Sequence, residues 1–291
     1  MNLHRLQNNK LSIAVSESGA ELKSLQSNSD GKEWMWQASP EFWPRTSPVL
    51  FPIVGKLRDN SFSHHARSYP LSQHGFARDR DFSLVASGQD FLRFRLEADE
   101  QSLRHYPFHF SLELEYRLEG SSLHVGYRVQ NEGKEKMPFS LGAHPGFSLP
   151  GWPSKKYFLE FDEDELLETI PLQDGLISHA ARRLVPAENR RIEISKELFH
   201  NDALIFSSLK SAWIGLLSEG AGPQLRLHFA GFPFLGIWSK PGAPFVCIEP
   251  WFGHADPMDF SADFSEKPGI RILQPSGLFE CSFSIEILSG E

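Results

Sequence analysis

The segment FHFSLELEYRL, residues 108–118, decides the fold class of this chain. Every even-numbered position in it is apolar and every odd-numbered position is polar. A two-residue period places all the apolar side chains on one face of an extended strand. The next residues, EGSS (119–122), have the composition of a turn, and LHVGYRV (123–129) then alternates again. We therefore predict a long antiparallel hairpin with one buried face.

Further strand patterns recur along the whole chain. Residues 279–287 alternate in the same way, and turn residues separate many shorter apolar runs. The best helical signal is the short segment Ser195–Phe199, which Ser195 could cap. Strands do not alternate with helices, so a parallel sheet is not expected. The prediction is one all-β domain, residues 1–291, a sandwich of two large antiparallel sheets with few short helices. The shorter strands are expected at 11–16, 20–27, 82–87, 91–97, 157–161, 203–207, 212–217, 225–230, 235–239 and 245–250.

Composition excludes several classes of protein. The 291 residues carry 29 Lys and Arg against 37 Asp and Glu, a net charge of −8. An acidic chain is a poor general partner for nucleic acid or anionic membrane, so neither is expected. Only two cysteines are present, too few for a disulfide scaffold. The N-terminal residues lack the apolar core of a signal peptide, and no apolar run is long enough to span a membrane. We expect a soluble cytoplasmic protein.

Four loops rich in glycine and proline hold the residues best suited to chemistry. Each combines a titratable or cationic side chain with Gly or Pro, which allow close approach and stiffen the backbone. Long loops in an all-β domain commonly carry function. The four are FPIVGKLRDN (51–60), QHGFARD (73–79), LGAHPGF (141–147) and IEPWFGHAD (248–256).

Glu249 is the most informative of these side chains. It follows Val246–Ile248 in a strand expected to be buried, and the two-residue period puts it on the same face as Cys247 and Trp251. A buried carboxylate must be paired, hydrogen-bonded or functional. A structural ion pair with an arginine is the alternative reading. For His74, His144 and the aromatic residues a purely structural role is likewise an open alternative.

Two other chemistries are weaker possibilities. His254 and Asp256, with Glu249, could form an oxygen and nitrogen metal set, but no second spaced pair of ligands supports it. Cys247 could be a nucleophile, although its place in a buried strand argues against exposure. We therefore expect no metal and no cofactor.

Taken together, the order Gly-x-x-Arg, His-Gly, His-Pro-x-Phe and Ile-Glu-Pro-Trp resembles the aldose 1-epimerase (galactose mutarotase) family. The segment GAELKSL (19–25) looks like that family's N-terminal hairpin, and FPIVG (51–55) with HGFAR (74–78) looks like a divergent bacterial branch. The match runs from about residue 19 to residue 285. It implies a β-supersandwich with a carbohydrate cleft, and an isomerase that needs no cofactor.

The resemblance also implies roles for individual residues. His144 matches the acid that protonates the ring oxygen, Glu249 matches the base that accepts the anomeric proton, and His74 matches a second histidine that holds or protonates the ring oxygen. Arg58 matches an arginine that binds sugar hydroxyl groups, and Asp202 is taken as the family's sugar-binding aspartate. Trp251 can stack on a sugar face, and Arg78 belongs to the cationic group beside the first two motifs.

The departures from the family concern the shape of the pocket. The better-known members carry His-Gly-Gly where this chain has His74-Gly-Phe76, and an aromatic followed by Asn-Leu after the His that matches His144. The resemblance therefore does not specify galactose. Because Lys56, Arg58, Arg78 and Arg80 gather around the first two motifs, a phosphorylated hexose is as good a candidate as a free one.

The function expected from the sequence is mutarotation, the interconversion of α and β anomers of a hexose. With ordinary pKa values, about 4.3 for Glu and 6.5 for His, the acid and base would be ready at neutral pH. The pH profile of kcat/KM would then be bell-shaped, with an acidic limb near pH 4–5 and a basic limb near pH 6.5–8. The alternatives are a non-catalytic carbohydrate-binding protein on the same fold and a metal-dependent sugar isomerase or hydrolase.

Overall fold

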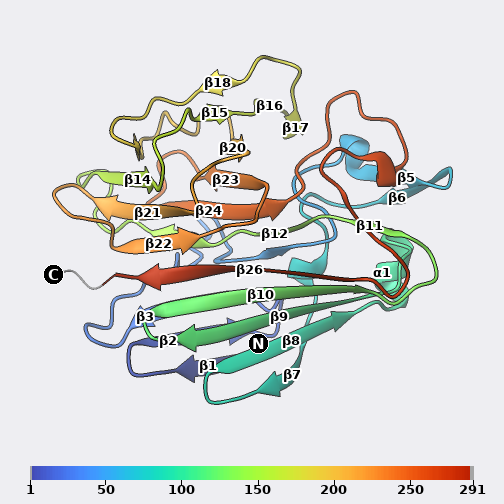
Figure 1. The fold of residues 1–291 in the computed structure, drawn as a ribbon, viewed down its shortest axis with the longest axis horizontal. Helices are drawn as coiled ribbons and strands as arrows, with labels where there is room; N and C mark the ends of the chain where they lie inside the picture. The colour runs from blue at the N-terminus through green and yellow to red at the C-terminus, as the bar shows by residue number, and fades with distance from the viewer. Residues whose placement is uncertain (1, 289–291) are drawn as a thin grey trace.

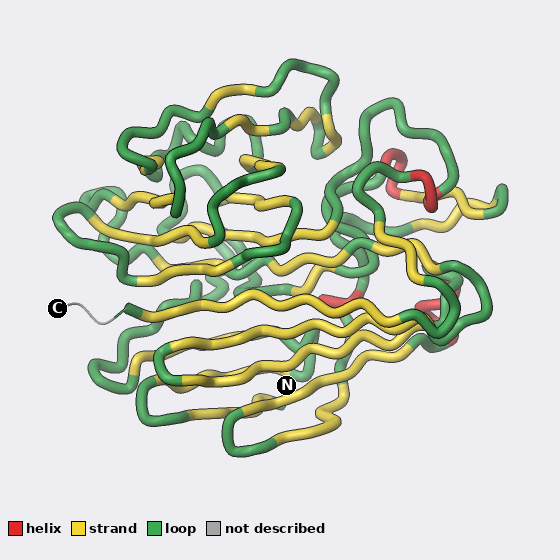
Figure 2. The backbone as a smooth tube through the Cα atoms, viewed as in Figure 1, coloured by secondary structure: helices red, strands yellow, loops and turns green. Residues whose placement is uncertain are grey.

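Antiparallel strands are the main regular secondary structure of the protein, in a computed structural model that describes residues 2–288. Figure 2 shows strands throughout and only a few short helices. Every strand pairing between named strands is antiparallel, and the two largest sheets have nine and six strands. The predicted fold class, an all-β sandwich of two large antiparallel sheets, is confirmed.

The larger sheet contains the predicted hairpin at its centre. Strands β9 and β10 pair through Leu118 and Leu123 next to a two-residue turn, in which Gly120 has a positive φ of 56°. Their alternate residues are buried, as the two-residue period predicts. In spatial order the sheet contains β19 (Arg191–Glu193), β14 (Tyr157–Phe161), β21 (Trp213–Ser218), β22 (Leu225–His228), β26 (Leu278–Ile287), β10 (Ser122–Asn131), β9 (Phe110–Glu119), β8 (Phe91–Glu97) and β7 (Ser83–Ser87).

The six-stranded sheet carries the functional loops. Its central strand, β24, is buried along its whole length, and Figure 1 shows it above the long strands of the larger sheet. A fully buried strand of this kind reads as a continuous apolar run, which makes its one carboxylate conspicuous. The sheet contains β20 (Leu204–Ser207), β23 (Phe234–Trp238), β24 (Phe245–Phe252), β12 (Leu141–Ala143) and β4 (Val49–Leu50), with β13 (Gly146–Ser148) also paired to β24.

Smaller elements complete the fold. An N-terminal sheet contains β1 (Leu3–Gln7), β2 (Leu11–Ser16) and β3 (Leu22–Ser27). Two-stranded pairs are β5 (Ser61–His64) with β6 (Arg67–Pro70), β11 (Met137–Phe139) with β25 (Arg271–Leu273), β15 (Glu168–Thr169) with β18 (Arg183–Leu184), and β16 (Leu172–Gln173) with β17 (Leu176–Ile177). The helices are α1 (Glu100–His105), η1 (Arg58–Asn60), η2 (Ala77–Asp79) and η3 (Phe264–Glu266).

The predicted helical turn at Ser195–Phe199 is wrong. Residues 196–200 form hydrogen-bonded turns that do not continue into a helix. The α-helix instead begins after Asp99, whose side chain accepts from the Ser102 backbone N–H while the Ser102 hydroxyl accepts from the Asp99 N–H. This reciprocal capping box stabilises a short helix that has little apolar periodicity of its own.

The core explains why the chain contains 24 phenylalanines. One continuous cluster of buried apolar side chains joins the two large sheets and the N-terminal sheet. Many of its largest members are fully buried phenylalanines, among them Phe51, Phe94, Phe110, Phe139 and Phe161. Among the described residues, no helix has the length and apolar character needed to cross a membrane.

Candidate active site

His144 lies in the short break between β12 and β13, opposite Glu249 on β24. Strands β12 and β13 both pair with β24, with Gly142 opposite Trp251 and Gly146 opposite Cys247. The same antiparallel register, continued between these two pairs, puts residue 144 opposite residue 249. His144 Nε2 is 3.2 Å from Glu249 Oε2, and both side chains are buried. The pairing of strands therefore brings together two residues that are 105 positions apart in the chain.

Two glycines make room for Trp251 beside this pair. A Cβ atom at Gly236 would lie 2.4 Å from the Trp251 indole, and one at Gly142 would lie 2.6 Å from it. Both distances are shorter than real Cβ contacts, so the indole requires glycine on the two flanking strands. The indole therefore lies over both flanking strands, and Trp251 lines the same cavity as Glu249, as the two-residue period predicted.

A tight loop brings His74 to the same place. Its backbone N–H donates to the Gly55 carbonyl at 2.9 Å, and the next residue, Gly75, has a φ of +73°. A Cβ at Gly75 would lie 2.2 Å from the Phe51 carbonyl oxygen, so only glycine fits. The His74 and His144 rings then meet edge to face, with centroids 5.6 Å apart.

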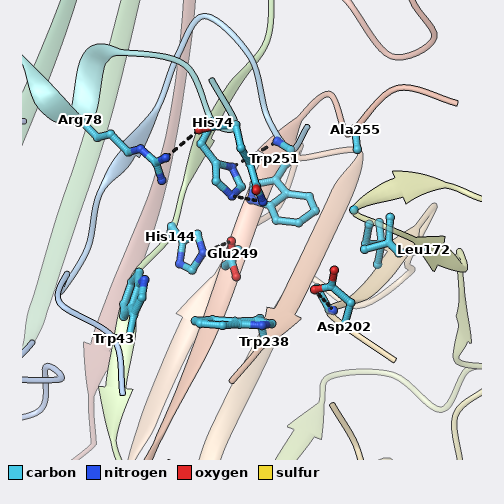
Figure 3. A pocket seen from close by; sticks show the side chains of 15 residues that line it. Trp43, His74, Arg78, His144, Leu172, Asp202, Trp238, Glu249, Trp251 and Ala255 are labelled. Atoms are coloured by element: carbon cyan, nitrogen blue, oxygen red, sulfur yellow. Dashed lines mark hydrogen bonds and ion pairs between the residues drawn. The ribbon is translucent and has the colours of Figure 1, made fainter. Parts of the chain in front are cut away.

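These residues line one cavity, shown in Figure 3, with a volume of about 280 Å³. That volume is near the lower end of the range of about 300–1,000 Å³ usual for small-ligand pockets, which favours a ligand the size of one sugar ring. Asp202 lies across the cavity from His144, where its carboxylate accepts from the Ala203 N–H at 2.7 Å. The lining residues are Trp43, Gly55, Gln73, His74, Arg78, His144, Leu172, Gly175, Asp202, Ala203, Ile205, Trp238, Glu249, Trp251 and Ala255.

Burial controls the protonation of the central pair. Burial raises the pKa of Glu249 well above its usual range, and the charge of Asp202 adds to this rise. Burial lowers the pKa of His144 to about 3, and the nearby Arg78 and Arg45 charges add to the fall. The expectation that both groups keep ordinary pKa values is therefore wrong. In the ligand-free site the pair favours neutral histidine beside protonated glutamate.

Part of the hydrogen-bonding capacity of the pair is unused. Glu249 Oε2 and His144 Nδ1 are buried and have no hydrogen-bond partner among residues 2–288. The 3.2 Å contact from His144 Nε2 to Glu249 Oε2 lacks hydrogen-bond geometry. Buried polar atoms without partners are costly and are seldom kept without a role. Here they face a cavity in which hydroxyl groups of a ligand could satisfy them.

His74 is held as a neutral hydrogen-bond donor. Its Nδ1 accepts from the Gly55 backbone N–H at 3.2 Å, which leaves the ring proton on Nε2, beside the Gln73 side chain. Burial lowers the pKa of His74 well below its usual range, and His144 and Arg78 act in the same direction. His74 can therefore donate a hydrogen bond to a ligand, but it is poorly placed to become a cation.

The two predicted arginines differ in their positions. Arg78 lines the cavity and donates to the Gln73 carbonyl at 2.7 Å. Its buried Nε lies 3.8 Å from Asp79 Oδ2 and has no hydrogen-bond partner among the described residues. Burial lowers the pKa of Arg78 to about 10, so it stays charged at neutral pH. Arg58 lies outside this cavity. It borders a separate surface depression, where its guanidinium donates to the Phe260 carbonyl at 3.3 Å.

Two tryptophans, Trp43 and Trp238, form aromatic walls of the site. Trp43 stacks on the His144 ring with centroids 4.8 Å apart, and Trp238 meets that ring edge-on at 5.8 Å. The sequence leaves Trp43 as either a core residue or a sugar platform, and it does not single out Trp238. The position of Trp238 on β23, two residues beyond Gly236, would have been the only sequence signal for its role.

Metal-binding alternatives can be compared with the donor atoms present. His144, Cys247 and Glu249 have potential ligand atoms within 4.8 Å of one another. Burial raises the pKa of both the Cys247 thiol and the Glu249 carboxyl, so a metal bound here would have to displace two protons. Asp256 is held by a buried ion pair with Lys267 Nζ at 2.9 Å, and the proposed set with His254 is not assembled.

Comparisons with known proteins match most of the chain. A family model described as aldose 1-epimerase matches residues 2–260, a range that includes every residue lining the cavity. The protein LacX from Lactococcus lactis subsp. lactis is 31% identical over 297 residues, which cover 98% of this chain and 99% of that protein.

Two solved structures also match almost the whole chain. A galactose mutarotase related enzyme from Lactobacillus acidophilus matches with a TM-score of 0.94 and 34% identity, covering 99% of this chain and 98% of that one. A galactose mutarotase-like protein from Lactobacillus casei matches with a TM-score of 0.93 and 29% identity, covering 99% of this chain and 100% of that one.

Proposed function

The chain belongs to the aldose 1-epimerase family, and we propose that it is a mutarotase that interconverts the anomers of a hexose without a cofactor. The observation that carries the proposal is the buried contact of 3.2 Å between His144 Nε2 and Glu249 Oε2, which opens on a cavity the size of a sugar ring. An acid and a base side by side are what ring opening requires.

In the proposed reaction, one proton leaves the sugar as another arrives. Glu249 removes the proton from the anomeric hydroxyl while His144 protonates the ring oxygen. The bond between C1 and the ring oxygen breaks and C1 becomes an aldehyde carbonyl. Rotation about the C1–C2 bond presents the other carbonyl face. In the reverse step Glu249 returns its proton to the carbonyl oxygen, and His144 takes back the proton of the re-formed ring oxygen.

The pair needs only a single shared proton for this cycle. Protonated histidine with ionised glutamate carries the same number of protons as neutral histidine with protonated glutamate. The two atoms are 3.2 Å apart, so a small rotation that aligns them would let the two forms interconvert by transfer of one proton. The neutral form favoured by burial is therefore a resting form of the same catalyst, and the pair titrates as a unit.

The remaining lining residues are proposed to bind the sugar. Arg78 and Asp202 supply a charged donor and a charged acceptor for hydroxyl groups, and neutral His74 donates toward the ring oxygen. Trp251, Trp43 and Trp238 offer apolar faces for the C–H groups of the ring. The positive charge of Arg78, with Arg45 close by, also suits a phosphate substituent, so hexose phosphates are included as substrates.

Polarimetry tests this function directly. Freshly dissolved α-anomers of glucose, galactose and their 6-phosphates are followed with and without the protein. We expect relaxation faster than the spontaneous rate for at least one sugar, unchanged by EDTA. Binding of a sugar without acceleration would favour a carbohydrate-binding protein. Activity that is lost in EDTA and restored by one divalent ion would favour a metal-dependent enzyme.

Replacing Arg78 by alanine is expected to raise KM about 10–100-fold with a smaller change in kcat. The reason is the loss of a charge-assisted hydrogen bond, worth about 1.5–3 kcal/mol, which is made to the bound sugar throughout the reaction. Arg58→Ala is the matched control and should leave both constants within about twofold, because Arg58 lies outside the cavity. An Arg58 effect larger than the Arg78 effect would reverse this assignment.

The pH profile of kcat/KM follows from the shared proton. Below about pH 3 His144 gains a proton while Glu249 keeps its own, so the base is lost. As the pH rises through the raised pKa of Glu249, the last proton leaves and the acid is lost. We expect the acidic limb well below 4.5, measured by polarimetry with circular dichroism to confirm that the protein is folded. An acidic limb near 4–5 would mean that Glu249 ionises with an ordinary pKa.

A further inference from the structure

A second cluster of metal-ligating side chains lies at the tip of the β5–β6 hairpin, away from the cavity. His64 is the last residue of β5 and pairs with Arg67, so His65 and Ala66 form a two-residue turn. Both turn residues have positive φ, 49° and 60°, as a type I′ turn requires. This conformation brings the His64 and His65 rings together, with centroids 4.1 Å apart.

Asp263 orients His64. Its Oδ1 lies 3.4 Å from His64 Nδ1, and its Oδ2 accepts from the His65 backbone N–H at 3.0 Å. The carboxylate is itself held by Ser265, through the backbone N–H at 3.0 Å and the hydroxyl at 2.7 Å. A histidine that donates from one ring nitrogen to a carboxylate presents the lone pair of the other nitrogen, the usual arrangement behind a metal ligand.

The second ring nitrogen of His64, Nε2, makes no hydrogen bond within the described residues. His64 is 8% exposed, and its Nε2 is buried with no hydrogen-bond partner among residues 2–288. The ring also packs against Phe108, with centroids 4.9 Å apart, which limits its freedom to turn. A fixed, buried and unpartnered ring nitrogen calls for a ligand.

Glu135 supplies a third donor from a different part of the fold. It lies in the loop between β10 and β11, and its Oε2 is 3.8 Å from His65 Nε2. Ligand atoms of His64, His65 and Glu135 all lie within 4.8 Å of one another. Tetrahedral zinc with bonds of about 2.0–2.1 Å separates its ligands by about 3.3 Å, so small rotations of the two exposed side chains close the set.

We propose that His64, His65 and Glu135 bind a divalent transition metal, with zinc as the best fit, and that Asp263 positions His64 for it. Two imidazoles and one carboxylate suit zinc rather than calcium or magnesium, which prefer oxygen ligands. Water would take the fourth position. Such a metal ties the tip of the β5–β6 hairpin to the loop that precedes β11, elements that Figure 1 shows beside each other.

Titration with Zn²⁺ alone, in competition with a chromogenic chelator, tests the site. We expect the wild-type protein to bind zinc with a Kd below about 10 µM, and His65→Ala and Glu135→Gln each to weaken binding at least about tenfold. Asp263→Asn should weaken binding by about 10–100-fold through His64. His65 and Glu135 are 73% and 72% exposed, so their variants should fold normally.

Two controls make the result specific. His124 and Glu119 form an exposed pair with atoms 3.6 Å apart, and within residues 2–288 no third donor joins them, so His124→Ala should leave zinc binding unchanged. His144→Gln tests the set in the cavity and should also leave it unchanged. Wild-type binding weaker than about 100 µM, or binding insensitive to His65→Ala and Glu135→Gln, would overturn the proposal. Mutarotase activity of His65→Ala is expected to match the wild type, so the outcome is independent of the proposed function.

Discussion

Replacing Glu249 by glutamine is expected to lower kcat by about 10²–10⁴-fold, equivalent to roughly 3–5 kcal/mol of transition-state stabilisation. Glutamine keeps the shape of the side chain but cannot accept the anomeric proton. Because burial favours the neutral form of Glu249, a neutral isostere should also leave the fold intact. Sugar affinity should change far less, since Arg78, Asp202 and the tryptophans share the binding. Polarimetry gives kcat, and thermal unfolding followed by circular dichroism gives stability.

Glu113→Gln is the matched control for this variant. Glu113 is also a buried carboxylate on a strand, but it lies on β9 and pairs with Arg95. Its replacement should affect stability alone and leave kcat unchanged. Wild-type turnover by Glu249→Gln would remove the proposed base and with it the proposed mechanism. A lowered melting temperature with normal turnover would instead identify Glu249 as a structural residue.

Replacing His144 by glutamine is the second change with a large expected effect, again about 10²–10⁴-fold in kcat. Glutamine fills much of the space between Trp43 and Trp238, but it cannot deliver a proton to the ring oxygen. The shared proton of the pair then has only one site, so the cycle cannot turn over. The same polarimetric assay measures the loss, with intrinsic tryptophan fluorescence to check the packing of Trp43 and Trp238.

His74→Gln separates the two histidines. Because His74 Nδ1 accepts from the Gly55 N–H, His74 acts in our proposal as a neutral donor that holds the ring oxygen. Its replacement should raise KM and lower kcat by less than the His144 change. If His74→Gln costs as much kcat as His144→Gln while KM stays constant, then His74 is the acid and the roles of the two histidines are exchanged.

Local pattern explains how much of the fold could be predicted. The strands at 11–16 and 91–97 begin and end where they were predicted, because alternation of residues between a buried and an exposed face is a property of the strand alone. The helix at Glu100–His105 could not be found in this way. It depends on a capping box of Asp99 and Ser102, and six residues are too few to show a helical period.

The candidate site was partly predictable for a different reason. A charged residue inside an apolar strand pattern identifies Glu249, and the order of the four loop motifs identifies the family and with it His144 and His74. Sequence spacing did not separate Arg78 from Arg58, because both follow glycine in similar loops. Arg58 lies in η1 and Arg78 lies in η2. Which of the two guanidinium groups reaches the cavity depends on how these two turns pack in the fold.

The sequence by itself determined the all-β class, the positions of the main strands and the family, because each of these is written in local periodicity or in short motifs. Only the tertiary structure decided which side chains meet and in what charge state. Strand register places His144 against Glu249, and the walls of Trp43, Trp238 and Trp251 exclude water from them. That burial shifts both pKa values toward the neutral pair. Desolvation is a property of the packed environment, so no inspection of the two residues in the chain could have given it.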